Sequence, residues 1–151
     1  MQLHDKTFAG LTAAELYAIL RVRAEVFVVE QNCVYLDPDG TDLQSRHLYL
    51  EEDGRILAYL RLFVREAEPL TVQIGRVLTT ERGKGYGKQL MQEAIRCAAE
   101  KMGAAKLYLE AQCYAEGFYE KLGFQTISAP FPEDGIPHVQ MIFTYPKQEI
   151  E

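Results

Sequence analysis

A glycine-rich turn carries the strongest chemical signal in this sequence. Residues 82–88 read Arg-Gly-Lys-Gly-Tyr-Gly-Lys, with a glycine at every second position and three basic residues among them. Glycine lets a backbone bend tightly and approach a ligand closely. The helix expected directly afterwards begins with N–H groups that lack partners and with the positive end of its dipole. The turn is therefore predicted to bind an anion, for which a pyrophosphate is the natural candidate.

Two well-known phosphate-binding loops do not fit this turn. The nucleotide P-loop requires GxxxxGK followed by serine or threonine, and the chain has no such stretch. The dinucleotide fingerprint GxGxxG also fails, because the third glycine comes one residue early. A flexible turn with solvated cations is the alternative interpretation of the same residues.

Hydrophobic periodicity predicts the elements that come before this turn. Thr12 and Glu15 have the spacing of a capping box, and the apolar stripe that follows predicts a helix over 13–28. The turn residues of 33–46 predict a loop. Three strands are expected next, over 47–52, 55–65 and 71–79. Asp-Gly at 53–54 joins the first two as a hairpin, and the third contains a glycine typical of a β-bulge.

The second half of the chain is predicted to alternate helices and strands. Apolar residues on one face predict a helix over 85–102, ended by Gly103. The remaining elements are a strand at 106–111, a helix at 116–122 and two strands at 124–128 and 139–145. Strand–helix–strand around 72–111 implies a parallel pair with a right-handed crossover. We expect a single domain over 1–151 with a mixed α/β fold, in which helices cover both faces of a mostly antiparallel sheet.

Two motifs in register resemble the GNAT family of N-acetyltransferases. The acetyl-CoA motif of that family has Gln or Arg, then Gly three residues later, then Gly or Ala two residues further on, and Arg82, Gly85 and Gly87 match it. Residues 116–124 read Glu-Gly-Phe-Tyr-Glu-Lys-Leu-Gly-Phe and resemble the family's FYxKxGF segment. The chain is also similar to the ElaA-type subgroup over 23–33, 39–42, 74–77 and 133–138.

The resemblance implies how acetyl-CoA is held. The strand at 72–79 would bulge and splay from the strand at 106–111, so that the pantetheine arm pairs with the backbone of Val77 and Thr79. A backbone N–H of Val77 or Leu78 would polarise the thioester carbonyl. The pyrophosphate would be bound by amides of the glycine turn and by its cations, and the full set of implied contacts beyond the strand is Arg82, Gly83, Lys84, Gly85, Tyr86, Gly87, Lys88, Gln112, Phe118 and Tyr119.

Catalytic roles also follow from the resemblance. Tyr119 stands where the family has a tyrosine that protonates the leaving thiolate, although an aromatic side chain packing beside Phe118 is the alternative. An alkyl amine has a pKa near ~10, so a base must take a proton before the amine can attack. Glu30, Glu110 and His138 are the candidate bases, and His138 is alternatively an ordinary turn histidine.

Several charged residues are open to two interpretations. Asp37, Asp39 and Asp42 either attract a cationic amine or form a solvated turn. Arg76 is expected to cross the sheet and to pair with Glu30 or Glu110. His47, at the start of a strand, is expected to be structural.

Composition restricts the partners. The net charge of -6 disfavours nucleic acid, and no apolar run approaches the ~20 residues of a membrane span. Three separated cysteines without a CxxC pair predict reduced thiols in the cytoplasm and no metal. A homodimer through the last strand stays open.

The resulting prediction is an acetyl-CoA-dependent N-acetyltransferase acting on an amine of a small molecule, peptide or protein. A CoA-binding module that has lost catalysis is one alternative, and a nucleotide-phosphate protein is another. The sequence leaves the acceptor unidentified.

Overall fold

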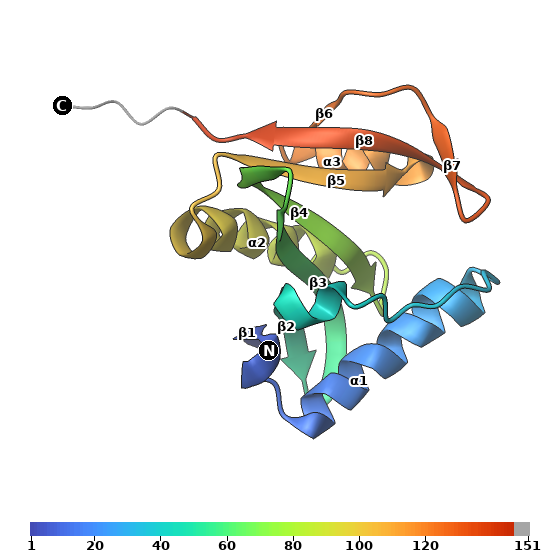
Figure 1. Ribbon diagram of the computed structural model, residues 1–151. Coiled ribbons are helices and arrows are strands. Elements are labelled where there is room, and N and C mark those ends of the chain that lie inside the picture. The colour runs from blue at the N-terminus through green and yellow to red at the C-terminus, as the bar shows by residue number, and fades with distance from the viewer. Residues whose placement is uncertain (147–151) are drawn as a thin grey trace.

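The strands of residues 1–146, the part of the chain that the computed structural model describes, form one mixed sheet (Figure 1). The strand order is β1-β2-β3-β4-β5-β8-β6, and β7 pairs with β8. The pair β4–β5 is parallel and the other pairs are antiparallel, which confirms the predicted mixed fold. The strands are β1 Gln2–Thr7, β2 Arg46–Glu52, β3 Arg55–Arg65, β4 Glu68–Thr79, β5 Lys106–Gln112, β6 Gln125–Thr126, β7 Phe131–Glu133 and β8 Ile136–Thr144.

The helices begin and end close to the predicted positions. Helix α1 (Ala13–Arg23) starts with the predicted capping box: the Thr12 Oγ1 accepts from the Glu15 N–H at 3.1 Å, and the Glu15 Oε1 accepts from the Thr12 N–H at 2.9 Å. It continues as a π-helical segment, η2 (Ala24–Glu30), two residues beyond the expected end. The other helical elements are α2 Tyr86–Met102, α3 Glu116–Lys121 and the 3-10 turns η1 Phe8–Gly10, η3 Thr41–Gln44 and η4 Cys113–Ala115.

The sheet is buried on both faces, as the alternation of its side chains shows. Leu48 and Leu50 of β2 pack in the large cluster that contains the apolar face of α2, whereas Tyr49 between them packs with Ile19 of α1. Successive side chains of a strand point to opposite faces, so α1 and α2 cover opposite sides of the sheet. None of the helices within residues 1–146 is long and apolar enough to cross a membrane.

A β-bulge reverses this alternation in β4. Two residues of β4, Arg76 and Val77, stand opposite one residue of β3, and Arg76 has a left-handed φ of 53°. The extra residue exchanges the two faces: Ile74 packs with the α2 cluster, but Leu78, four residues later, packs with the α1 cluster. The bulge expected in this strand is therefore present, with Arg76 rather than the neighbouring glycine as its left-handed residue.

Strands β4 and β5 are paired over only part of their length. Their register joins Thr71–Gln73 to Lys106–Tyr108, and beyond Gln73 the two strands separate (Figure 1). The expected splay is thus present, and it begins just before the bulge.

Two strands were missing from the sequence-based prediction, and others were shorter or shifted. The edge strand β1 was missed because Gln-Leu-His-Asp-Lys-Thr has no apolar run of its own and is extended through its pairing with β2. The expected strand at 124–128 is reduced to the two residues of β6. The strand expected at 139–145 begins earlier, because β7 and β8 form a hairpin through Asp134-Gly135, whose positive φ values of 49° and 76° suit a tight turn.

Candidate active site

A cleft of about 780 Å³ opens where β4 and β5 separate. It runs from the glycine turn before α2 to the β7–β8 hairpin and the end of η2. Of the predicted site residues, Lys84 is exposed and outside the lining. The cleft brings together the others: Glu30, Val77, Leu78, Thr79, Arg82, Gly83, Gly85, Tyr86, Gly87, Lys88, Glu110, Gln112, Phe118, Tyr119 and His138.

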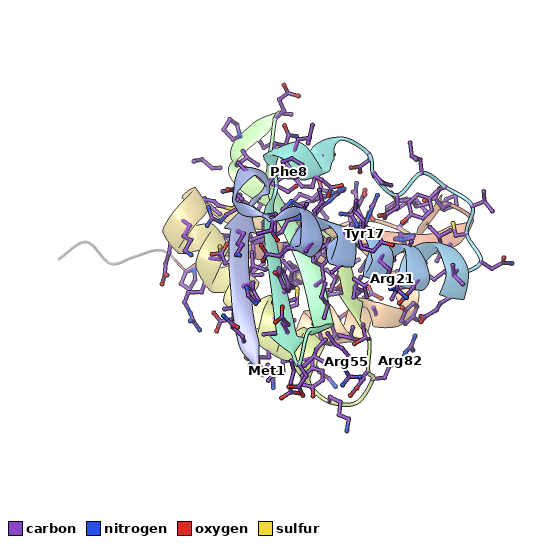
Figure 2. All side chains as sticks on the ribbon, turned by 90° about the horizontal axis from the view of Figure 1, so that it is seen from below. Met1, Phe8, Tyr17, Arg21, Arg55 and Arg82 are labelled. Carbon is purple, nitrogen blue, oxygen red and sulfur yellow. The ribbon has the colours of Figure 1, made fainter. Side chains whose placement is uncertain are left out.

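The glycine turn presents main-chain N–H groups at one end of the cleft. The first hydrogen bond of the following helix runs from the Gln89 N–H to the Gly85 carbonyl, so the N–H groups of residues 86–88 precede the hydrogen-bonded ladder. Gly83 and Gly85 have φ values of 74° and 77°, which favour glycine. Arg82 extends from the outer side of this turn (Figure 2). This end of the cleft combines free amides, a helix dipole and cations, as an anion site requires.

Gly87 is needed for space rather than for backbone conformation. A Cβ placed there would lie 3.3 Å from Thr79 Cγ2 and 3.6 Å from a ring carbon of Phe118. The helix start therefore packs closely against the end of β4 and against α3. Gly87 thus lets three elements, β4, α2 and α3, meet closely at this point.

Tyr119 lies deep in the cleft wall, with only 8% of its surface exposed. It packs edge-on against Phe118 and Phe124, with ring centroids 5.0 Å and 5.9 Å away. Burial, and to a lesser degree Tyr114, raises the pKa of the Tyr119 hydroxyl, so this group keeps its proton at neutral pH. Burial thus keeps the Tyr119 hydroxyl in its neutral, protonated form within the cleft wall.

The opposite end of the cleft is acidic and comes from several elements. Glu110 accepts a hydrogen bond from the Tyr108 hydroxyl at 3.0 Å. The Gln112 amide donates to Gln31 Oε1 at 3.3 Å, which links β5 to η2. Glu30 lies on the exposed side of η2. These groups place negative charge and polar atoms at this end of the cleft.

The β7–β8 hairpin contributes a residue that the sequence-based prediction did not assign. Glu133 lines the cleft, and its Oε2 is 3.6 Å from Nε2 of His138. The Glu133 side chain is 46% exposed, and the partial desolvation of its carboxyl group is the largest cause that raises its pKa, with Glu110 the next. The Asp134-Gly135 dipeptide was a readable hairpin signal, like Asp53-Gly54, and would have placed Glu133 across from the start of the last strand.

Two buried arginines fix the loop between η2 and β2. Arg23 is fully buried, and its Nε and Nη1 lie 2.8 Å from Asp37 Oδ2 and 2.7 Å from Asp42 Oδ1. Arg61 of β3 donates to Asp39 Oδ2 at 2.7 Å and to Asp42 Oδ1 at 2.9 Å. Burial alone would raise the pKa of Asp39 and of Asp42, but their arginine partners outweigh it and lower both values. The suggestion that these aspartates attract the acceptor is wrong for Asp37 and Asp42, which are buried and already paired.

The bulge is tied to the same loop. Arg76 Nε lies 2.8 Å from Asp37 Oδ1, and its Nη2 lies 3.0 Å from the Asp37 carbonyl oxygen. The expected partners Glu30 and Glu110 are therefore wrong. A left-handed non-glycine residue costs about 1–2 kcal/mol, and this ion pair holds Arg76 in that conformation. Asp37 thereby supports the backbone that carries Val77 into the cleft.

His47 is structural, as expected. It is fully buried, with Nδ1 2.7 Å from the Tyr59 hydroxyl and Nε2 3.0 Å from the Asp42 carbonyl oxygen. Burial is the main cause that lowers its pKa, which keeps the ring neutral.

Known proteins resemble this chain over nearly its whole length. The family model for the acetyltransferase (GNAT) domain matches residues 24–145. A UPF0039 protein of Schizosaccharomyces pombe is 41% identical over 140 residues, which cover 90% of this chain and 92% of the relative. ElaA of Escherichia coli is 37% identical over 145 residues, which cover 93% of this chain and 95% of ElaA.

Solved structures are similar to the same extent. The crystal structure of Escherichia coli ElaA has a TM-score of 0.88 at 36% identity and covers 94% of this chain and 98% of its own. An acyl-CoA N-acyltransferase from Pseudomonas aeruginosa has a TM-score of 0.89 at 40% identity and covers 95% of this chain and 100% of its own.

Proposed function

The chain belongs to the GNAT acetyltransferase family and is similar to its ElaA-like members, and from this premise we propose that it transfers the acetyl group of acetyl-CoA to a primary amine. The Pseudomonas aeruginosa relative bears the name acyl-CoA N-acyltransferase, which supports an acyltransferase with the same class of donor. The acetyl group and the amine acceptor are the finer parts of this proposal.

One observation carries the proposal: the free amides of the glycine turn and the splay of β4 from β5 lie in the same cleft. The turn is suited to the pyrophosphate of coenzyme A. The pantetheine arm would then extend along β4 past Val77 and Thr79, pairing with its backbone like an added strand. The thioester would thus reach the bulge, in the part of the cleft that the acidic residues line.

The reaction is proposed to proceed by direct attack in a ternary complex. The neutral amine attacks the thioester carbonyl carbon, whose oxygen accepts a hydrogen bond from the backbone N–H of Val77 or Leu78. The C–N bond forms as the C–S bond breaks. The leaving thiolate is proposed to take the proton of Tyr119, which is in its protonated form at neutral pH. The amine loses its protons to a base at the acidic end, for which Glu30, Glu110 and His138 are candidates.

Calorimetry and a turnover assay test this function. Isothermal titration with acetyl-CoA, ATP and NAD is expected to show heat with acetyl-CoA alone. Release of free CoA thiol from acetyl-CoA in the presence of a panel of primary amines is expected to identify acceptors. Absence of acetyl-CoA binding would overturn the proposal, and tight binding without turnover on any amine would leave a CoA-binding module.

The proposed location and assembly rest on the cysteines and on strand pairing. The three cysteines are free thiols, which fits the cytoplasm. The homodimer was predicted through the last strand, but β8 is already paired with β5 on one side and with β6 and β7 on the other. Gel filtration with light scattering would test whether the chain forms a homodimer through another surface.

A further inference from the structure

The pairing of β7 with β8 and of β8 with β5 brings Glu133 and His138 to the end of the cleft where β4 and β5 are separated. The hairpin register sets Glu133 opposite Ile136 and Phe131 opposite His138, so Glu133 and His138 share one face. On the other side of β8, His138 stands opposite Gln112, the last residue of β5. Since β4 and β5 are paired only as far as Tyr108, this end of β5 is where the cleft is open.

The tautomer of His138 follows from its main-chain contact. Its Nδ1 lies 2.7 Å from the carbonyl oxygen of Ile136, and a carbonyl oxygen can only accept. Nδ1 therefore carries a hydrogen, and Nε2 of the neutral ring carries a lone pair. That Nε2 faces Glu133 Oε2 at 3.6 Å, a separation too long for a direct hydrogen bond. Two acceptors thus face each other across a gap that attracts one proton.

The other candidate bases are less suited to receive a proton. Glu110 already accepts from Tyr108, and the Arg65 guanidinium lies 3.8 Å above the Tyr108 ring. Glu30 lies exposed at the end of η2. His138, by contrast, is 8% exposed, and its ring is held by Ile136 on one side and by the Phe131 ring at 6.1 Å on another.

We propose, on the basis of the proposed acetyl transfer, that His138 is the base that deprotonates the acceptor amine and that Glu133 positions and stabilises it as imidazolium. The acceptor R–NH₃⁺ transfers one proton to His138 Nε2 and becomes R–NH₂. This amine forms the C–N bond with the acetyl carbon while the C–S bond breaks and the thiolate takes a proton from Tyr119. The second nitrogen proton leaves to solvent, and the proton held by His138 returns through solvent to the Tyr119 phenolate. The enzyme is then restored, and the products are the amide, CoA thiol and one released proton.

The charges around the pair support this assignment. Glu133 is faced by Glu110 from β5, by Asp134 from its own turn, by His138 from β8 and by Arg76 from β4. Burial and the two carboxylates raise the pKa of Glu133, while His138 and Arg76 act in the opposite direction. The excess of negative charge at this position favours a cationic acceptor and an imidazolium ion.

Steady-state kinetics with acetyl-CoA and either 1,4-diaminobutane or n-butylamine test the roles. His138→Gln is expected to lower kcat about 100-fold near pH 7, with the acetyl-CoA KM within about twofold of wild type. Glu133→Gln is expected to shift the acid limb of kcat/KM to lower pH by about one unit, because removing the carboxylate disfavours the protonated ring. Both defects should shrink near pH ~10, where the amine is itself neutral.

Two control variants separate this role from general charge effects. Asp134→Asn removes a neighbouring carboxylate and is expected to raise the amine KM, because less negative charge faces the cationic acceptor. Its kcat should stay within about twofold of wild type. Glu120→Gln, on the exposed side of α3, should leave every parameter unchanged. A His138→Gln enzyme that keeps at least half of the wild-type kcat, or a loss that is equal at all pH values, would overturn the proposal.

A readout that needs no acceptor keeps the two proposals distinguishable. In NMR spectra of the ¹⁵N-labelled protein, His138 is expected to be the Nδ1–H tautomer when neutral. The midpoint of its ring titration should fall by about one pH unit in Glu133→Gln. An Nε2–H tautomer or an unchanged midpoint would refute the pair even if CoA binds, and failure of wild type to bind acetyl-CoA would refute the proposed function without touching the pair.

Discussion

The two ends of the cleft are built in different ways. One end, which we propose binds acetyl-CoA and call the donor end, comes from one continuous stretch, residues 82–88, whose glycines and cations are neighbours in sequence. The other end, where we propose that the amine enters, is assembled from η2, β5 and the β7–β8 hairpin. The bulge between the two ends depends on a loop held by Arg23, Arg61 and Arg76. A site made of sequence neighbours can be recognised in the sequence as a motif. A site made of residues from separate segments can be recognised only in the folded chain.

The largest expected effect is the loss of stability on removing a buried arginine, compared with removing an exposed one. Arg23→Met leaves Asp37 and Asp42 buried without their main partner, so the free energy of unfolding should fall by about 3–5 kcal/mol. Urea denaturation measures this loss. Arg21→Gln, on the outer side of the same helix (Figure 2), removes an exposed pair with Glu25 and should cost less than about 0.5 kcal/mol. Equal losses in the two variants would contradict the structural role of Arg23.

Next in size is the effect of removing the Tyr119 hydroxyl. Tyr119→Phe keeps the aromatic packing against Phe118 and Phe124 but removes the proton donor, so kcat should fall about 100-fold with CoA affinity unchanged. The rate of CoA thiol release measures kcat, and calorimetry measures the affinity for CoA. Tyr17→Phe, at an exposed tyrosine of α1, is the control and should be silent. Full turnover of Tyr119→Phe across pH would leave this tyrosine with a packing role alone.

A matched pair of glycines tests the donor end. Gly85 and Gly54 have φ values of 77° and 76°, and a Cβ at either would meet no atom within 4 Å. Gly85→Ala and Gly54→Ala should therefore lose similar stability, about 1–2 kcal/mol each. Only Gly85→Ala should weaken CoA binding, by about tenfold, because its amide belongs to the turn. Calorimetry that finds equal CoA affinity in both variants would remove the turn from the binding site.

The smallest effect distinguishes the cations of the turn. Arg82 lines the cleft, and Arg82→Gln should raise the Kd for CoA about fivefold, with a smaller change at high salt. Lys84 is exposed outside the lining, so Lys84→Gln should change the Kd less than twofold. A larger effect at Lys84 would mean that its side chain turns toward the ligand.

Much of the fold was predictable because its signals are local. The capping box of α1, the Asp53-Gly54 hairpin and the Gly103 helix end are each read from adjacent residues. Strand β1 was not predictable in this way, since it is polar at most positions and is defined by its hydrogen bonds to β2. The π-helical segment η2, which continues α1, likewise has no sequence signal that the periodicity of 3.6 residues could reveal.

The candidate site was likewise predictable only where its signals are local. Periodicity placed the glycine turn between a strand and a helix, and the motif resemblance selected Tyr119. The partners of Arg76 were wrong, because charge alone does not say which of many carboxylates a buried guanidinium reaches. The pairing of Glu133 with His138 depends on the register of the hairpin, which the Asp134-Gly135 turn sets.

The sequence by itself determined the order of the helices and of most strands, the mixed sheet and the glycine turn, because each follows from backbone preferences and apolar spacing over a few residues. Only the tertiary structure decided which carboxylates are buried with arginine, where β4 leaves β5 and which nitrogen of His138 faces Glu133. These features depend on distances between segments far apart in the chain, and such distances are set when the sheet and its two helical layers pack together.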